Sequence, residues 1–370
     1  MENSKGIPNI VLMAPLPPPA GGIGRWAERY LELSNNYSIN ILLCNESVIG
    51  RRKVFGKKSK INIFSEIKRT VNIWKSLKKN IVKFGNDCVV HCCIPAYKNS
   101  LRRELISLKI AKKNKAKFII HFRSTISNSI ATKKEEKYLR KMLTGCDYCI
   151  VLNEASYEHA LRYIGKDKIK IVPNFISRNE IIQYKNINEK LEKIVYVGGV
   201  VKEKGCDLLL SVAELRRDLK FTLIGNPSEE IEKIISEKKL SNVKLLGEQP
   251  KDAVIKELDS SDAFIFLSRF SGEGFSNAVL EAMARGLPCI VSDWASNKEQ
   301  IGEMGLKYNL SIKNDDPFLI SKALDILGAK NTREKISNYN ISRVKSCYSE
   351  DIVMKQYISI YKDVKRRKND

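Results

Sequence analysis

The stretch SRFSGEGFSNAVLEAMARGLPCIVSD, from Ser268 to Asp293, carries the strongest indication of the fold. A short apolar run ends at Ser268, Gly272 and Gly274 supply a turn, and a helix is expected to begin near Ser276. This order of strand, glycine turn and helix is typical of a parallel βαβ unit. It predicts that the helix start faces the edge of the sheet where strands end.

The same stretch contains groups suited to a polyhydroxylated ligand. The backbone N–H groups of Gly274, Phe275 and Ser276 are expected to be helix-start donors, which have no partner inside the helix. Glu273 precedes the helix, and Glu281 lies two turns further on the same face. Carboxylates accept hydrogen bonds from hydroxyls, while amides donate them. The residues alone also fit an ordinary strand–turn–helix with two solvated glutamates.

Short β-rich runs and longer helical patterns alternate on both sides of this stretch, which predicts an α/β fold. In the first half we predict strands over 9–14, 39–44, 88–91, 117–121, 148–152 and 169–172, and helices over 23–33, 66–84, 101–113, 133–143 and 155–164. In the second half we predict strands over 194–197, 221–224, 243–245, 263–268 and 289–292, and helices over 207–217, 229–239, 276–285, 317–327 and 352–366. Two Rossmann-like domains, with a cleft between their strand ends, would account for this repeat.

A length of 370 residues exceeds what one core usually organises, which also favours two domains. We expect an N-terminal domain over residues 1–175 and a polar, weakly patterned linker over 176–192. A C-terminal domain would follow over 193–345. The last segment, 346–370, is expected to form a helix that packs back toward the N-terminal domain.

Composition limits the class of protein. With 43% hydrophobic and 29% charged residues, the chain is neither collagen-like, low-complexity nor broadly disordered. No apolar run approaches the roughly 20 residues that span a bilayer, and the first residues lack a signal-peptide layout. The nine cysteines show no disulfide framework and are expected to be reduced thiols. We therefore expect a cytoplasmic protein.

The positive charge is concentrated in one half of the chain. Residues 1–175 hold 33 Lys and Arg against 13 Asp and Glu, a net charge of +20, whereas residues 176–370 have a net charge of only +3. Such asymmetry indicates an anionic partner for the first half. Nucleic acid, an acidic lipid surface and a phosphorylated substrate all fit.

Four segments, in order, resemble the retaining glycosyltransferases of family 4, which have the GT-B fold. The Glu273-Gly-Phe sequence followed by EAMARGLPCIVSD is similar to the E-x7-E signature of that family. YVGGVVKEKGCDLLL (Tyr196–Leu210) resembles its phosphate-binding segment, and KIVPNFIS (Lys170–Ser177) resembles its interdomain crossing. PAGGIGRW (Pro19–Trp26) is similar to its first glycine loop.

The resemblance implies a role for each matching residue of the second half. Glu273 would lie against the donor sugar, with Gly274 and Phe275 as backbone donors beside it. Glu281 would hold the ribose hydroxyls of the nucleotide. Lys204 would neutralise the donor diphosphate, where a fixed cation stabilises the charge of the leaving group.

The chain departs from the family at one phosphate-binding position. Where the family commonly has arginine after the strand glycine, this sequence has Gly199. A bidentate guanidinium clamp on the phosphate would be lost there. Lys202 is the candidate that would compensate for it.

The first half supplies further candidates. Gly21, Gly22 and Gly24 follow a strand and open a helix, a pattern that fits nucleotide binding or a tight turn. The resemblance implies that the loop, with Gly22 and Gly24, approaches the donor phosphates. It also implies that His121, at the end of a strand, contacts the donor sugar. For His91 we expect a structural role.

We expect neither a metal ion nor another cofactor. Cys146-x-x-Cys149 lacks the second pair that a zinc site would need. No Asp-x-Asp motif stands out as a ligand for a divalent ion. Positively charged side chains and helix starts would then bind the diphosphate.

The helix expected over 66–84 combines lysines and arginine with an apolar stripe that includes Trp74, next to the basic segment 51–60. Cationic and apolar stripes together are typical of a helix that lies on an anionic membrane. A helix that packs its apolar face on the sheet fits the pattern equally well, and one helix can do both.

The sequence thus favours a retaining glycosyltransferase that moves a sugar from a nucleotide diphosphate sugar to a lipid-linked or polysaccharide acceptor. It would act in cell-surface polysaccharide biosynthesis, in the cytoplasm and peripherally on the inner face of the membrane. An inverting GT-B enzyme, such as a sugar-nucleotide epimerase, is the alternative. A basic nucleic-acid-binding protein is another, although no recognition motif accompanies the lysines, so no nucleic-acid partner is expected. An NAD enzyme is disfavoured because the glycine spacing over 21–24 does not fit.

Overall fold

The computed structural model describes residues 6–18, 21–47, 63–85, 88–302, 310–312 and 315–367. It divides into two compact units. Among the described residues, unit 1 comprises those up to Asn174 together with the last segment from Asp351, and unit 2 comprises those of Phe175–Glu350. The basic segment 51–60 and Pro19, both named above, lie outside the described residues.

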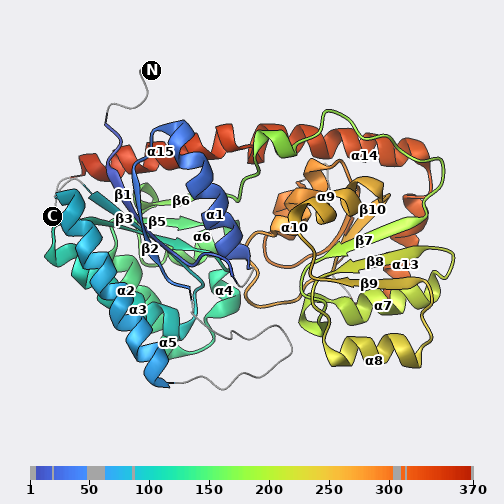
Figure 1. Cartoon of the computed structure of the whole chain (residues 1–370), viewed down its shortest axis with the longest axis horizontal. Coiled ribbons are helices and arrows are strands. Elements are labelled where there is room, and N and C mark those ends of the chain that lie inside the picture. The colour runs from blue at the N-terminus through green and yellow to red at the C-terminus, as the bar shows by residue number, and fades with distance from the viewer. Residues whose placement is uncertain are drawn as a thin grey trace. The chain divides into compact units, whose positions relative to one another are not determined.

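Unit 1 is built on a parallel sheet of six strands in the order β2-β1-β3-β4-β5-β6. Its strands are β1 (Asn9–Ala14), β2 (Ile41–Asn45), β3 (Cys88–Ile94), β4 (Lys117–Phe122), β5 (Tyr148–Val151) and β6 (Ile169–Ile171). Its helices are α1 (Gly22–Ser34), α2 (Ile63–Phe84), α3 (Lys98–Lys113), α4 (Ile126–Ser129), α5 (Lys133–Gly145), α6 (Glu154–Ala160) and α15 (Glu350–Arg366). Figure 1 shows α2, α3 and α5 along one face of this sheet and α1 and α15 along the other.

The central strands of unit 1 are buried on both faces, as expected for a parallel sheet covered by helices. All seven residues of β3, CVVHCCI, are buried. Helix α2 packs only one narrow stripe, Ile73, Leu77 and Ile81, into the core. Because β3 lies at the middle of the sheet, its polar residue His91 must find its partners inside the protein.

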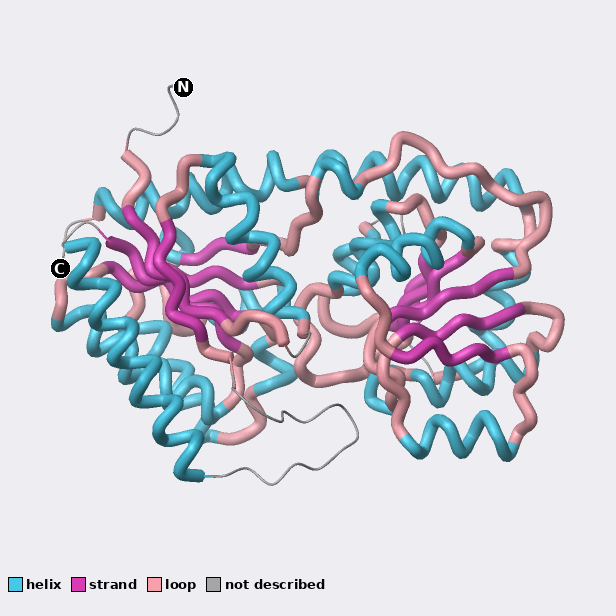
Figure 2. Tube along the Cα trace, viewed as in Figure 1, coloured by secondary structure: helices cyan, strands magenta, loops and turns pink. Residues whose placement is uncertain are grey.

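Unit 2 contains a second parallel sheet, in the order β12-β11-β10-β7-β8-β9. Its strands are β7 (Lys193–Val197), β8 (Lys220–Ile224), β9 (Val243–Gly247), β10 (Ala263–Phe266), β11 (Cys289–Ser292) and β12 (Leu310–Ile312). Its helices are α7 (Cys206–Leu215), α8 (Glu229–Glu237), α9 (Lys251–Ser260), α10 (Asn277–Ala284), α11 (Asn297–Ile301), α13 (Pro317–Ile326) and α14 (Lys330–Arg343), with short 3₁₀ turns at Arg178–Glu180 and Lys202–Lys204. In Figure 2 the strands of each unit form one group of magenta segments covered by cyan helices.

The strand order of unit 2 places its two halves on either side of the β7–β10 pair. Strands β8 and β9 follow β7 in one direction, and β11 and β12 follow β10 in the other. Loops that leave the carboxyl ends of two such strands diverge, and ligands bind in the crevice that results. The loops after β7 and β10 are therefore where a ligand site is expected in this unit.

The prediction of an α/β fold with two Rossmann-like domains is confirmed. The division between the units falls between Asn174 and Phe175, and the last helix, α15, belongs with unit 1. Residues 176–192 belong to unit 2 and are held there by hydrogen bonds: the Lys185 ammonium donates to Asp259 O at 2.8 Å, and Asn188 donates to Asp262 Oδ1 at 2.8 Å. Across the described ranges, every helix is too short or too polar to span a bilayer.

Candidate functional site

The site of unit 2 forms where the turn after β7 meets the loop after β10. The backbone N–H of Arg269 donates to Glu203 O at 3.0 Å and ties the two loops together. Gly205 ends the 3₁₀ turn Lys202–Lys204 with a left-handed φ of +75°. A Cβ atom at this position would lie 2.1 Å from Leu267 O, so only glycine allows the two loops to approach this closely.

This approach brings Lys204 and Glu273 together. The Lys204 ammonium donates a hydrogen bond to Glu273 Oε1, and the Ser268 hydroxyl donates to the same oxygen at 3.1 Å. The two charged side chains are only 14% and 11% exposed. Lys204 Nζ also lies 4.7 Å from the centre of the Phe270 ring. A cation and a carboxylate are thus held side by side at the strand ends.

The loop after β10 leads directly into helix α10, as the sequence predicts. Ser276 is the N-cap residue, and its hydroxyl accepts a hydrogen bond from Val279 N at 3.3 Å. The buried Phe275 ring packs edge-on against Tyr348, with ring centres 5.2 Å apart. Glu281 lies on α10 and is half-buried. The loop between Glu273 and α10 is therefore anchored at its helix end, and Gly274 within it is buried.

The two residues named for the unusual phosphate segment, Gly199 and Lys202, contact residues outside this pair of charges. Gly199 is half-buried, and its carbonyl accepts a hydrogen bond from the Tyr196 hydroxyl at 2.8 Å. The exposed ammonium of Lys202 lies 3.6 Å from the Glu230 carboxylate on α8. Compensation for the missing arginine by Lys202 stays a prediction.

In unit 1, the glycine cluster forms the start of α1. Gly22 is the first residue of this helix and is exposed. Gly24 is buried, and a Cβ atom there would lie 3.3 Å from Pro17 Cδ, so the helix start packs tightly on the proline segment. The role of both glycines in binding a donor stays a prediction.

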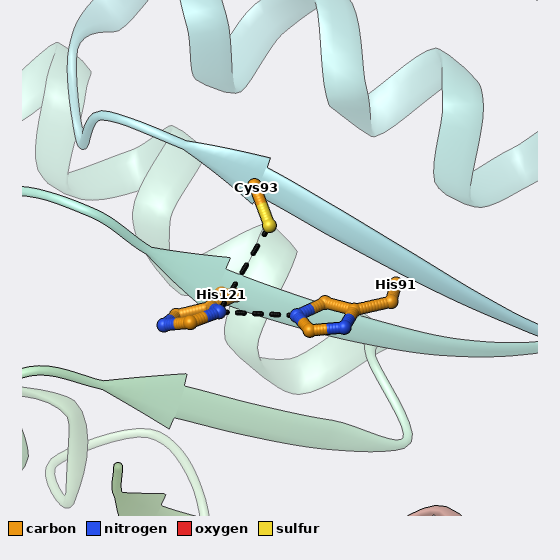
Figure 3. Close-up of side chains that lie close together, drawn as sticks. All are labelled: His91, Cys93 and His121. Atoms are coloured by element: carbon orange, nitrogen blue, oxygen red, sulfur yellow. Dashed lines mark hydrogen bonds between the residues drawn. The ribbon is translucent and has the colours of Figure 1, made fainter. Parts of the chain in front are cut away.

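His121 lies inside unit 1 and is fully buried. Its partner across the β3–β4 ladder is Cys93, while His91 pairs with Ile119. Because side chains alternate along a strand, His91, Cys93 and His121 all project to the same face of the sheet (Figure 3). In the structure, His121 is hydrogen-bonded to Arg123. The contact of His121 with a donor sugar, which the resemblance implies, stays a prediction.

The two histidines belong to a buried chain of hydrogen bonds. Arg123 Nη1 donates to His121 Nε2 at 3.1 Å, and Arg123 Nη2 donates to Asn174 Oδ1 at 2.6 Å. His121 Nδ1 lies 3.0 Å from His91 Nε2, and His91 Nδ1 lies 2.7 Å from the Tyr361 hydroxyl. The chain links β3 and β4 to helix α15.

Burial and the nearby guanidinium fix the protonation of this chain. Desolvation lowers the pKa of His91 to about 3 and holds the pKa of His121 well below its usual range, so both rings are neutral at pH 7. Since Arg123 can only donate, His121 Nε2 must accept, which leaves the proton on His121 Nδ1. His91 Nε2 then accepts, and His91 Nδ1 donates to Tyr361.

Two groups in the described residues of unit 1 have potential metal ligands within 4.8 Å of one another: His91, Cys93 and His121 in one, and Glu46, Cys92 and Glu104 in the other. In the first group, the ring nitrogens of both histidines already have hydrogen-bond partners in Arg123, in each other and in Tyr361. In the second, Arg103 donates hydrogen bonds to the carboxyl oxygens of both Glu46 and Glu104. Histidine, arginine and tyrosine partners of this kind have no local signature in the sequence.

Of the predicted site residues, the structure brings together Lys204 and Glu273, with Gly274, Phe275 and Ser276 in the same loop and Glu281 on the helix that follows. Gly22, Gly24 and His121 lie in the other unit. Sequence reasoning did not identify Ser268, which shares the Glu273 oxygen with Lys204. Its place at the end of β10, five residues before Glu273, is the signal that could have found it.

Three comparisons with known proteins show what this chain is similar to. Residues 177–343 match the family model described as glycosyl transferases group 1. The chain is 29% identical over 262 residues to an uncharacterised 41.2 kDa protein in the cps region of Klebsiella pneumoniae, covering 65% of this chain and 71% of the relative. It is 24% identical over 249 residues to a capsular polysaccharide biosynthesis glycosyltransferase of Staphylococcus aureus, covering 60% of this chain and 63% of the relative.

Among solved structures, a sucrose-phosphate synthase of Thermosynechococcus elongatus superposes with a TM-score of 0.78 at 14% identity, over 96% of this chain and 99% of the other. At this identity, the likeness supports the shared fold alone. The matched region includes the loop with Glu273 and the turn with Lys204. Residues 177–343 are thus similar to the glycosyl transferases group 1 domain, relatives include named glycosyltransferases, and the fold is that of GT-B enzymes; together these findings support a glycosyltransferase.

Proposed function

We propose that the protein is a retaining, metal-independent glycosyltransferase that transfers a sugar from a nucleotide diphosphate sugar to a lipid-linked or polysaccharide acceptor. The process would be cell-surface polysaccharide biosynthesis, since one relative is a capsular polysaccharide glycosyltransferase and another is encoded in a cps region. Neither the epimerase nor the nucleic-acid alternative gains support from the matched domain or the relatives.

The observation that carries this proposal is the pairing of Lys204 with Glu273 at the ends of β7 and β10. When the glycosidic bond to the diphosphate breaks, negative charge grows on the leaving phosphate oxygens. A cation held in place beforehand stabilises that charge without reorganisation. The neighbouring carboxylate accepts hydrogen bonds from sugar hydroxyls, so one side of the pair binds phosphate and the other binds sugar.

The pairing also indicates how the free site is kept intact. Lys204 and Glu273 neutralise each other, and Ser268 satisfies the same carboxylate oxygen. Two buried charges without this pairing would carry a desolvation cost of several kcal/mol each. A bound diphosphate would share the Lys204 ammonium, which has three donor hydrogens.

Thermal shift with UDP-glucose, UDP-galactose, UDP-N-acetylglucosamine and GDP-mannose tests the proposal, because a ligand that binds only the folded state raises the melting temperature. We expect one nucleotide to stabilise the protein whether or not EDTA is present. The anomeric configuration of the product, read by NMR, then tests retention. If none of these compounds raises the melting temperature at millimolar concentration, the donor assignment fails.

We further propose that unit 1 docks on an anionic membrane through helix α2. Beside its buried stripe, α2 exposes five apolar side chains: Ile63, Phe64, Ile67, Val71 and Val82, between 37% and 84% exposed. Exposed lysines flank them at positions 68, 75, 78, 79 and 83. Apolar side chains that reach the acyl boundary, next to cations that meet acidic headgroups, are typical of interfacial helices.

Each lysine near an acidic surface contributes about 1 kcal/mol, so four or more suffice for reversible attachment. Replacing Lys75, Lys78, Lys79 and Lys83 with Gln should therefore release the protein from vesicles of phosphatidylglycerol. The matched control replaces four exposed lysines of unit 2, at positions 190, 220, 244 and 256, and changes the net charge equally. If vesicle binding decreases equally in both quadruple variants, the net charge of the protein explains the binding, and the proposal that α2 docks on the membrane is wrong.

A further inference from the structure

Four side chains of residues 292–300, which we call the brace, hold the loop that carries Glu273. All four donate hydrogen bonds to backbone carbonyls of residues 268–276, and donors and acceptors follow in the same order along the two segments. The bonds run from Ser292 Oγ to Ser268 O at 2.6 Å, from Trp294 Nε1 to Phe270 O at 2.8 Å, from Ser296 Oγ to Gly274 O, and from Gln300 Nε2 to Ser276 O at 2.9 Å.

The inner part of the brace is sealed from solvent. Ser296 and Gln300 are completely buried, and Gln300 N also donates to Ser296 O at 2.8 Å. Hydrogen bonds in such surroundings are stronger than in water, and a buried group that loses its partner is costly. The hydrogen bonds to the carbonyls of Gly274 and Ser276 are therefore costly to break.

The brace contains a strained residue. Ala295, between Trp294 and Ser296, has a left-handed φ of +52°, which residues other than glycine and asparagine rarely adopt. This turn takes the chain from the end of β11 into α11 within a few residues. Non-glycine residues in this conformation persist where the surroundings hold them, and they cluster at functional sites.

Glu273 lies between two of the tethered carbonyls, those of Phe270 and Gly274. Its own backbone N–H donates to Phe270 O at 3.0 Å, the same carbonyl that Trp294 holds. Trp294 and Ser296 therefore hold the backbone on either side of Glu273, while Ser268 and Lys204 donate hydrogen bonds to its carboxylate. Loops place groups less accurately than strands or helices unless other residues support them in this way.

We propose that Ser292, Trp294, Ser296 and Gln300 are positioning residues of the donor site. They act through the loop carbonyls and fix Glu273 and the start of α10 where the sugar of the donor binds. The assignment rests on the proposed function, because the donor site is the one proposed above. Lys204 follows β7, and Glu281 lies in the second turn of α10, beyond the carbonyls that the brace holds, so we expect the brace to affect binding of the nucleotide diphosphate less than placement of the sugar.

Two substitutions remove a single donor each: Trp294→Phe keeps an aromatic ring but loses the N–H, and Ser296→Ala loses the hydroxyl. The chain offers a matched control for both. Trp74 Nε1 and Ser337 Oγ are buried and have no hydrogen-bond partner among the described residues, so Trp74→Phe and Ser337→Ala make the same chemical change without breaking a bond. The probe is whichever of the four nucleotide sugars above stabilises the wild type most, together with its nucleotide diphosphate.

Each brace variant should lower kcat/KM for the nucleotide sugar about threefold to tenfold, the range for one neutral hydrogen bond. The loss should fall mainly on kcat, and affinity for the nucleotide diphosphate alone should stay at the wild-type value. Ser296→Thr, which keeps the hydroxyl, should retain more activity than Ser296→Ala. Amide hydrogen exchange should become faster in residues 268–276 of the brace variants and stay unchanged in both controls.

Equal losses of nucleotide and nucleotide-sugar affinity in the brace variants would overturn the assignment, since they would show a general structural role. Wild-type kinetics and unchanged exchange over residues 268–276 would overturn it as well. A third outcome is that the wild type binds none of the nucleotide sugars, while hydrogen exchange over residues 268–276 is still faster in the brace variants. That result would contradict the proposed function, but it would support the role of the brace in holding the loop. The exchange measurement therefore separates the two failures.

Discussion

Replacing Gly205 with Ala should damage both the stability of unit 2 and its donor site. Gly205 has a φ of +75°, and the added Cβ would lie 2.1 Å from Leu267 O. Ordinary contact begins at 3.4 Å, so the turn after β7 and the end of β10 would have to move apart by about 1.3 Å. Lys204, the residue before Gly205, would move away from Glu273 with that turn.

The expected magnitude has two parts. A left-handed conformation costs a residue with a Cβ atom roughly 1–2 kcal/mol. Overpacking adds about 1–3 kcal/mol, because backbone rather than a flexible side chain must move. In a unit of this size, 1 kcal/mol shifts the melting temperature by about 2–4 °C, so a decrease of roughly 4–20 °C is expected.

Gly247 is the matched control. It has a similar φ of +66°, but nothing lies within 4 Å of a Cβ built there. Gly247→Ala should therefore show the conformational cost alone, about 2–8 °C, and keep its nucleotide affinity. Differential scanning calorimetry and nucleotide titration of both variants decide the matter. If Gly205→Ala and Gly247→Ala have the same melting temperature, and Gly205→Ala binds nucleotide as tightly as the wild type does, the close approach of the two loops is not what forms the site.

The remaining predictions concern single residues. Glu281→Ala should weaken nucleotide binding about 10- to 150-fold without lowering the melting temperature, as isothermal titration and a thermal melt will show. Lys204→Ala should weaken binding similarly but also destabilise the free protein, because Glu273 would lose its buried partner; an unchanged melt would contradict the pairing. Burial raises the pKa of Glu46 to about 8, so the folded state binds a proton that the unfolded state has released, and stability should fall between about pH 5 and 8 by about 1 kcal/mol per pH unit. Glu46→Gln should flatten that dependence in urea titrations across the same range. Tyr361→Phe should cost about 1–3 kcal/mol of unfolding free energy by leaving the His91 N–H without its acceptor, whereas an unaltered urea midpoint would show that the buried chain is not coupled.

Local pattern was sufficient to predict most of the architecture. The alternation of apolar runs and helical stripes predicted most of the strands and the larger helices, and the glycine turn before Ser276 predicted the start of α10. Helix α14, Lys330–Arg343, was not predicted, because its sequence KNTREKISNYNISR has no apolar stripe and is rich in Asn and Ser. Tertiary contacts hold it: the Asn340 side chain donates to Leu287 O at 2.7 Å, and Arg333 is fully buried.

The site residues were predicted individually, but their arrangement was not. Lys204 and Glu273 are 69 residues apart, and their contact depends on β7 and β10 being neighbours. The chain from Arg123 through His121 to His91 depends on the register of β3 and β4, which no local pattern specifies. The brace was missed because its bonds go to backbone carbonyls, which carry no sequence signal.

The central claim is that Lys204, held beside Glu273, binds the diphosphate of a nucleotide sugar. Isothermal titration of UDP-glucose, UDP-galactose, UDP-N-acetylglucosamine and GDP-mannose into the wild type and into Lys204→Met tests it most directly. The account predicts that one of these donors binds the wild type with a dissociation constant between about 1 µM and 1 mM, and that Lys204→Met weakens that binding at least about tenfold. Equal affinity in the two proteins, or binding of none of the four donors by the wild type, would contradict it.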